Sequence, residues 1–149
     1  MKILIIEDDN NLAQYIKEDL MAKANSVDIV DNGTQGSYLA RVNSYDVIII
    51  DYSLPDKNGL DVCLEIRNSG SISSILFLSM NQSVQNKIQC LEAGADDYMT
   101  KPFSIEELNA RIKALSRRPK KIDNSILSYR DIVLDTNKQI VKKVIKLYI

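Results

Sequence analysis

Side chains that can hold a metal ion or a phosphoryl group follow four separate strand-like segments of the chain. Glu7 and Asp8 come directly after a first apolar run, and Asp51 ends another. Ser79 and Lys101 follow two later ones. In a parallel α/β sheet the carboxyl ends of the strands meet at one edge, and ligands bind there. The sequence therefore predicts up to three carboxylates, a hydroxyl and an ammonium at one edge.

This set of groups suits phosphoryl chemistry with Mg²⁺. Carboxylates held close together repel one another, and a cation between them relieves the repulsion. Oxygen ligands in an open site favour Mg²⁺, which bridges carboxylate and phosphate oxygens. A carboxylate beside the metal can attack phosphorus and form an acyl phosphate. Lys101 would neutralise charge on the transferred group, and Ser79 would donate a hydrogen bond to it.

Taken singly, the same residues have simpler explanations. Acidic residues 7–9 before a helix can complement the helix dipole, and Asp51 can belong to a turn. Ser79 can cap a helix, and Lys101-Pro102 can form a turn with the cis bond found in about 5% of such bonds. Their joint occurrence, each at the end of its own strand, favours one site.

The apolar pattern predicts the elements that position these residues. Short apolar runs typical of buried strands occupy Lys2–Ile6, 27–30, 45–50, 75–78 and 97–99. Helical spacing follows each run, with the later four helices at 34–42, 60–67, 84–93 and 105–116. The alternation predicts an α/β fold, a doubly wound parallel sheet of five strands flanked by five helices.

Local signals indicate helix ends and inward faces. Asn10 or Asn11 is expected to cap the first helix, and residues 104–107 form a capping box for the last. On the first helix Leu12, Ile16 and Leu20 are expected to face the sheet, and on the third Leu60, Leu64 and Cys63.

Composition excludes several classes of protein. Of the 149 residues, 45% are hydrophobic and 26% charged, as in soluble globular domains. No apolar run approaches the roughly 20 residues that span a bilayer, and no signal peptide is visible. Without histidine, histidine-based zinc sites, catalytic triads and phosphohistidine carriers are excluded. Cys63 and Cys90 lack metal-site spacing and predict buried thiols in a reducing cytoplasm.

Charge divides the chain. Residues 1–110 contain 8 Lys and Arg against 17 Asp and Glu, a net charge of −9, and residues 111–149 contain 11 against 3, a net charge of +8. Such asymmetry marks either a module with an anionic partner or a solvated basic segment. The change of pattern near residue 119 predicts a domain over 1–119, a linker over 120–125 and a short β extension over 126–149.

Three stretches together resemble the receiver domain of bacterial two-component response regulators. They are residues 2–9 (KILIIEDD), 51–59 (DYSLPDKNG) and 94–103 (GADDYMTKPF). The resemblance covers 1–118 and implies a flavodoxin-like or CheY-like sheet with strand order 2-1-3-4-5. It also implies a cytoplasmic phosphoprotein of a phosphorelay that receives its phosphoryl group from a sensor histidine kinase and regulates transcription.

In that family the matching positions have defined roles. The resemblance implies that Asp51 accepts the phosphoryl group. Asp8 and Asp51 would bind Mg²⁺ directly, the backbone carbonyl of Ser53 would be a third ligand, and Glu7 would act through water. Lys101 would contact the phosphoryl group.

Two further positions match the family's switch. Ser79 would move toward the phosphoryl oxygen and Tyr98 would turn inward, which repacks the face of the fourth helix, fifth strand and fifth helix. The chain is similar to the OmpR/PhoB type, whose receivers form homodimers through this face. The matching charge pairs are Lys87 with Glu107, Asp97 with Arg111 and Asp96 with Arg118. The matching apolar patch is Leu91, Ala110 and Ile112.

Two regions depart from the family pattern. Met80 stands where a small residue is usual and is expected to narrow access to Asp51, while Asn81 and Ser53 occupy positions that tune dephosphorylation. Residues 126–149 resemble the first strands of a winged-helix effector domain, without the helices that enter the major groove of DNA. Contact with DNA is therefore expected only through effector helices that these 149 residues lack.

The same residues raise three alternative functions, and two of them fit the sequence poorly. The first is a receiver that acts by protein–protein contact with weak or no phosphorylation, and the large side chain of Met80 beside the site favours it. A haloacid-dehalogenase-type phosphatase is a second alternative, but it needs an acid/base Asp two residues after the nucleophile, where this chain has Ser53. A flavin phosphate site is a third alternative, but its phosphate loop needs Ser or Thr and Gly after the first strand, where the acidic residues 7–9 would repel a phosphate. Beyond Mg²⁺-dependent self-phosphorylation and autodephosphorylation, no enzyme activity is expected.

Overall fold

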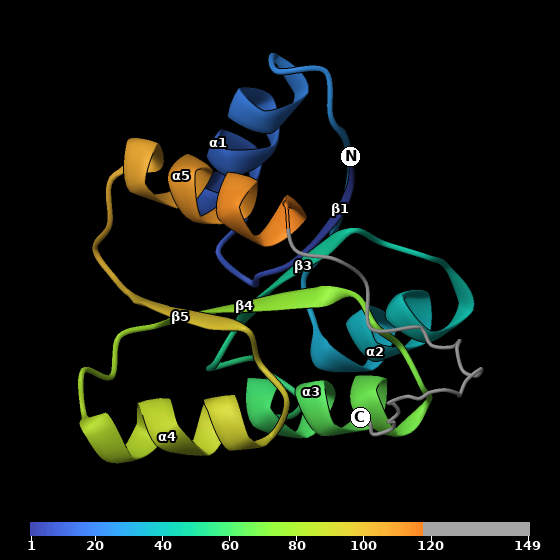
Figure 1. The fold of residues 1–149 in the computed structure, drawn as a ribbon, viewed down its shortest axis with the longest axis vertical. Coiled ribbons are helices and arrows are strands. Elements are labelled where there is room, and N and C mark those ends of the chain that lie inside the picture. The colour runs from blue at the N-terminus through green and yellow to red at the C-terminus, as the bar shows by residue number, and fades with distance from the viewer. Residues whose placement is uncertain (118–149) are drawn as a thin grey trace, which may run out of the picture. The chain divides into compact units, whose positions relative to one another are not determined.

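A computed structural model describes residues 1–117, in which five strands alternate with five helices (Figure 1). The predicted linker 120–125 and β extension 126–149 lie outside the described residues. The strands are β1 Lys2–Ile6, β2 Ser26–Val30, β3 Val47–Asp51, β4 Ser74–Ser79 and β5 Asp97–Thr100. The helices are α1 Asn10–Met21, α2 Gly33–Val42, α3 Gly59–Asn68, α4 Val84–Glu92 and α5 Ile105–Ser116. The predicted alternation of elements is confirmed.

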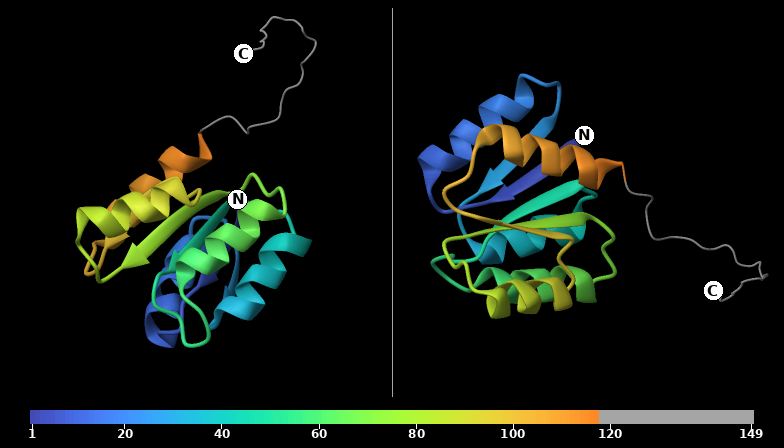
Figure 2. Two further views of the ribbon diagram at one scale, coloured as in Figure 1. Left: turned by 90° about the horizontal axis from the view of Figure 1, so that it is seen from below. Right: turned by 60° about the vertical axis from the view of Figure 1, so that its left-hand side comes forward.

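All five strands are parallel and form one sheet in the order β2-β1-β3-β4-β5. Helices α1 and α5 cover one face, and α2, α3 and α4 cover the other (Figure 1). The right-hand view of Figure 2 shows the same layers from another side, with α1 and α5 next to each other. The amide of Asn109 on α5 donates to Asp19 on α1 at 2.6 Å and joins this layer. The predicted doubly wound fold is confirmed.

Strand residues alternate between two apolar cores, because successive side chains point to opposite faces of a sheet. On β1, Ile3 and Ile5 pack with α1 and α5, and Leu4 and Ile6 pack with the helices of the other face. Every residue of β3 is buried. This double burial explains why the strands are continuous apolar runs rather than alternating ones.

The structure corrects two local predictions. Asp9, and not Asn10 or Asn11, caps α1, since its carboxylate accepts a hydrogen bond from the Leu12 amide at 3.1 Å. Leu64 is 42% exposed, although it was expected to face the sheet. The inward face of α3 is formed by Cys63, as expected, together with Gly59, Val62 and Ile66, which are spaced three and four residues apart.

Both thiols are buried and unpaired, which confirms their predicted burial. Burial raises the pKa of Cys63 and of Cys90 to about 11. The two residues therefore act as small apolar side chains in the core beneath α3 and α4.

Candidate functional site

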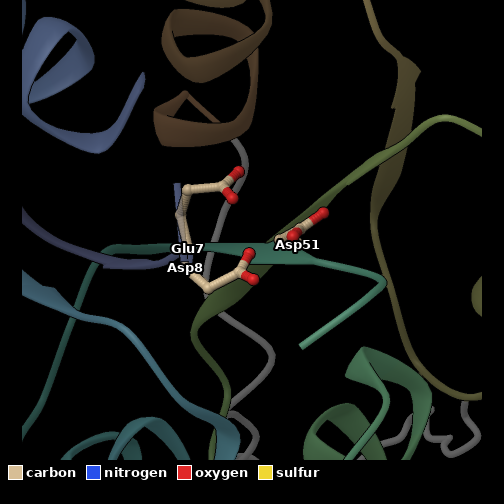
Figure 3. Close-up of side chains that lie close together, drawn as sticks. All are labelled: Glu7, Asp8 and Asp51. Atoms are coloured by element: carbon tan, nitrogen blue, oxygen red, sulfur yellow. The ribbon is translucent and has the colours of Figure 1, made fainter. Parts of the chain in front are cut away.

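The three predicted carboxylates come together where β1 and β3 end. Glu7 and Asp8 directly follow β1, and Asp51 is the last residue of β3. The two strands are neighbours with Ile6 opposite Ile50, so the ends of both strands reach the same edge. One carboxylate oxygen from each residue lies within 4.8 Å of the other two, as the grouped side chains in Figure 3 show.

Lys101 joins this group from β5, at the edge of the sheet. It follows β5, and its ammonium lies 2.9 Å from Glu7 Oε1 and 3.2 Å from Asp51 Oδ1. Its backbone N–H donates to the carbonyl of Ser79 at 2.8 Å, and the Lys101–Pro102 bond is cis. The structure thus brings the predicted amine to the predicted carboxylates.

Burial makes the charges of this site interact strongly. Asp51 is only 5% exposed, and burial followed by the negative charge of Glu7 raises its pKa to about 7, against the opposing effect of Lys101. Burial lowers the pKa of Lys101, but the hydrogen bond and charge of Glu7, with those of Asp51, outweigh it and leave that pKa above its usual value. One ammonium therefore only partly compensates two buried carboxylates.

The donor set fits a hard divalent cation. Glu7 and Asp51 are buried, whereas Asp8 is exposed and keeps the site open to solvent. All three ligand atoms are carboxylate oxygens, which Mg²⁺ prefers. A cation here would relieve the repulsion that raises the pKa of Asp51. Glu7, Asp8 and Asp51 are the residues that could hold it.

Ser53 lies on the loop that connects β3 to α3. This loop closes on itself, because Ser53 forms an isolated antiparallel bridge with Asn58 and the Gly59 N–H donates to the Tyr52 carbonyl at 2.7 Å. Gly59 is required at the start of α3, since a Cβ there would lie 2.7 Å from the carbonyl oxygen of Asp51. The loop is therefore fitted closely against the end of β3.

The predicted switch residues are linked through the loop after β4. Ser79 ends β4, and its hydroxyl accepts a hydrogen bond from the Asn81 N–H at 3.0 Å. Tyr98 is buried, and its hydroxyl donates to the Asn81 carbonyl and accepts from the Asn86 amide at 2.8 Å. In this structure Tyr98 already points inward. Met80, by contrast, is 76% exposed and does not pack into the site.

Sequence reasoning missed Asn86. The residue is buried on α4, four positions before the buried Cys90, so the helical spacing alone places it on the inward face. A polar residue on such a face needs a hydrogen-bond partner. That requirement was the available signal, although it does not identify Tyr98 as the partner.

The residues predicted to form a dimer interface fall into four groups. Four of them are exposed on α4 and α5: Lys87, Leu91, Glu107 and Ala110. Ile112 was expected in the surface patch, and this is wrong for the structure described, because Ile112 is 1% exposed within the core beneath α5. Arg118 lies outside the described residues.

The remaining charges of this group have partners within the chain. Arg111 contacts Asp97 at 2.9 Å and Glu107 at 3.1 Å. Asp96 contacts Arg67 at 3.0 Å and also accepts the Ile75 N–H. Pairing of Asp96, Asp97 and Arg111 across a dimer stays a prediction.

A parallel sheet in this order, with carboxylates after β1 and β3 and a lysine after β5, defines the receiver class of signalling domain. Residues 3–113 match the family described as the response regulator receiver domain, so the chain belongs to that family. The predicted resemblance to receiver domains is confirmed. Among residues 1–117, no helix combines the length and apolar character needed to cross a membrane.

Known proteins of this family are similar over most of the chain. The transcriptional regulatory protein CiaR of Streptococcus pneumoniae is 39% identical over 142 residues, which are 95% of this chain and 63% of CiaR. CusR of Escherichia coli, also named a transcriptional regulatory protein, is 41% identical over 118 residues, 79% of this chain and 52% of CusR. The chain thus spans little more than half the length of these curated relatives.

Solved structures agree with the fold. The receiver domain of the Francisella response regulator 1452 matches with a TM-score of 0.75 and 36% identity. The match covers 78% of this chain and 97% of that domain. The similarity therefore corresponds to a whole receiver domain.

Proposed function

We propose that this chain is the phosphorylated module of a two-component response regulator of the OmpR/PhoB type, with Asp51 as the phosphoacceptor. The observation that carries the proposal is the placement of Asp51, a buried carboxylate at the sheet edge beside Glu7, with the ammonium of Lys101 in contact with both. Family membership supports this proposal over the phosphatase and flavin alternatives.

Asp51 would act as the nucleophile. One of its carboxylate oxygens attacks the phosphorus of a phosphohistidine on a sensor kinase, and the new O–P bond forms as the P–N bond breaks. The electron pair of the broken bond stays on the imidazole nitrogen, which takes up a proton. Lys101, at 3.2 Å from Asp51, is placed to stabilise negative charge on the transferred group.

The proposed Mg²⁺ site consists of Asp8 and Asp51 as direct ligands, the backbone carbonyl of Ser53, and Glu7 through water. The acidic cluster supports this assignment. When bound, the cation supplies the positive charge that lets an anionic phosphoryl group approach an anionic carboxylate. Glu7 has a second role in the apo protein, since it holds Lys101 at the site.

The signal would leave the site through Ser79. If its hydroxyl turns to the new phosphoryl oxygen, the hydrogen bond from the Asn81 N–H is lost. Asn81 also accepts from Tyr98, so the change reaches β5 and α4. We propose that this repacking of the α4-β5-α5 face controls homodimerisation.

The partners are part of the same proposal. A sensor histidine kinase in the cytoplasm would donate the phosphoryl group. Control of transcription would belong to the longer regulator, as the names of CiaR and CusR suggest. The chain itself would have no activity beyond its own phosphorylation and dephosphorylation.

A direct test is phosphorylation by acetyl phosphate or phosphoramidate, with intact-mass spectrometry as the readout. The wild type should gain one phosphoryl group with Mg²⁺ and none with EDTA, and Asp51→Ala should gain none. Asp61→Ala, which removes an exposed carboxylate from the first turn of α3, is the control and should label normally. Equal labelling of Asp51→Ala would overturn the assignment. An unlabelled wild type would favour a receiver that acts by contact alone.

A further inference from the structure

The loop between β3 and α3 is fastened at its tip to a different element, the start of α2. Asp56 accepts hydrogen bonds from the backbone N–H groups of Gly33 and Thr34, both at 2.8 Å, and from the hydroxyl of Thr34. These partners lie 22 and 23 residues away in the sequence. Asp56 thus satisfies two of the N–H groups that a helix start leaves without partners.

Packing reinforces this contact. A Cβ on Gly33 would lie 2.6 Å from Lys57 Cγ and 2.9 Å from Val62 Cγ2, so α2 begins in direct contact with the loop. Lys57 is held in turn by an ion pair with Glu65 on α3 at 2.9 Å. Hydrogen bonding and packing therefore fix the same position of the loop.

The hydrogen bonds also keep Asp56 charged. The Thr34 hydroxyl, with the Gly33 and Thr34 N–H groups, holds the pKa of Asp56 well below its usual range. The contact therefore persists over the whole neutral pH range. Asp56 is exposed, so its hydrogen bonds and not its burial define its place.

We infer that Asp56 is a positioning residue for the metal site. The hydrogen bonds described for Asp56 do not include Glu7, Asp8 or Asp51. Asp56 instead anchors the loop that also carries Ser53, three residues earlier in the chain. Because the bridge to Asn58 and the Asp56 anchor hold both sides of the loop, the Ser53 carbonyl is set before a cation arrives. When a ligand group is already ordered, binding does not have to supply the entropy cost of ordering it. The inference rests on the proposed function, in which Ser53 is a ligand of Mg²⁺.

A residue that only caps α2 would behave differently. Its removal would loosen the helix start and lower stability, but the affinity for Mg²⁺ would not change. A positioning residue couples the two sites, and coupling is reciprocal. Cation binding should then protect the Gly33 and Thr34 amides in return.

The test is an NMR titration of the apo protein with MgCl₂, combined with amide hydrogen exchange in the same samples. Asp56→Ala should weaken Mg²⁺ binding by about fivefold or more, and Asp56→Asn and Thr34→Val by less, since each keeps part of the contact. Asp61→Ala removes a nearby charge without touching the anchor and should stay within about twofold of wild type. Mg²⁺ should slow exchange of the Gly33 and Thr34 amides in the wild type but not in Asp56→Ala.

The outcomes separate the two proposals. A wild-type dissociation constant in Asp56→Ala, together with faster exchange at Gly33 and Thr34, would overturn the inference and leave Asp56 as a cap. A wild type that binds no Mg²⁺ would overturn the proposed function and this inference with it. Thr34→Val keeps both backbone hydrogen bonds, so it provides a folded variant if Asp56→Ala loses its amide dispersion.

Discussion

At the scale of single residues, Asp51 combines a chemical role with an unfavourable environment. Its carboxylate is almost fully buried beside Glu7, and Lys101 is shared between the two. The short distances between these carboxylates would let a cation and a phosphoryl group bind. In the apo protein the same short distances destabilise the fold when Asp51 is ionised. Stability and function should therefore oppose each other at this residue.

Replacement of Asp51 by Asn should stabilise the apo protein at alkaline pH. The pKa of Asp51 rises from near 4 in the unfolded chain to about 7 in the folded protein. Between these values the folded state binds more protons, so the wild type loses stability as pH rises through this window. In EDTA at pH 8, Asp51→Asn should raise the free energy of unfolding by roughly 1–3 kcal/mol.

Urea unfolding at pH 5 and pH 8 measures this effect. The difference in free energy of unfolding between Asp51→Asn and the wild type should be smaller at pH 5, where the carboxyl of Asp51 in the folded wild type is largely protonated. Mg²⁺ should stabilise the wild type at pH 8 and have less effect on the variant. Equal stability of the two proteins at both pH values would show that Asp51 is not under electrostatic stress.

At the scale of elements, the position of α2 depends on a glycine. A Cβ on Gly36 would lie 2.5 Å from Ile6 Cδ1 and 2.8 Å from both Cγ1 and Cγ2 of that side chain. The residue after Ile6 is Glu7, so the close packing of α2 on β1 also supports the end of the strand that enters the site.

Gly36→Ala should destabilise the protein by about 1–3 kcal/mol, because overpacking outweighs the gain in helix propensity of about 1 kcal/mol. Thermal or urea unfolding measures the change. In an Ile6→Ala background the clash is gone, and Gly36→Ala should become neutral or stabilising. A destabilisation that persists in that background would mean that Ile6 is not the obstacle.

The elements also show what the sequence can predict. Buried parallel strands are continuous apolar runs, so their number and order along the chain are visible, as are Asp51 and Lys101 at their ends. The residue that caps a helix is not fixed by sequence alone, because Asp9, Asn10 and Asn11 can all cap and only the backbone conformation selects Asp9. The anchor of Asp56 on α2 has no local signature, since Asp is ordinary in a turn and its partners are distant in sequence.

At the scale of the whole molecule, the proposed switch and the proposed interface share α4. Asn86 bonds the hydroxyl of Tyr98, and the ammonium of the next residue, Lys87, lies 5.9 Å from the centre of the Tyr98 ring. A change at Tyr98 would therefore alter the position of Lys87. This contact supports a link between the site at the sheet edge and the charges expected to face a second subunit.

Charge reversal tests that interface. Lys87→Glu and Glu107→Lys should each weaken the dimer formed with beryllofluoride and Mg²⁺ by about tenfold or more, because each places like charges opposite each other in the expected pair. The double variant restores opposite charges and should recover most of the affinity, as measured by sedimentation equilibrium. Lys17→Glu on α1 is the matched control and should dimerise like the wild type. If both single variants dimerise normally, the α4-β5-α5 face is not the interface. If the double variant fails to recover, Lys87 and Glu107 do not face each other across it.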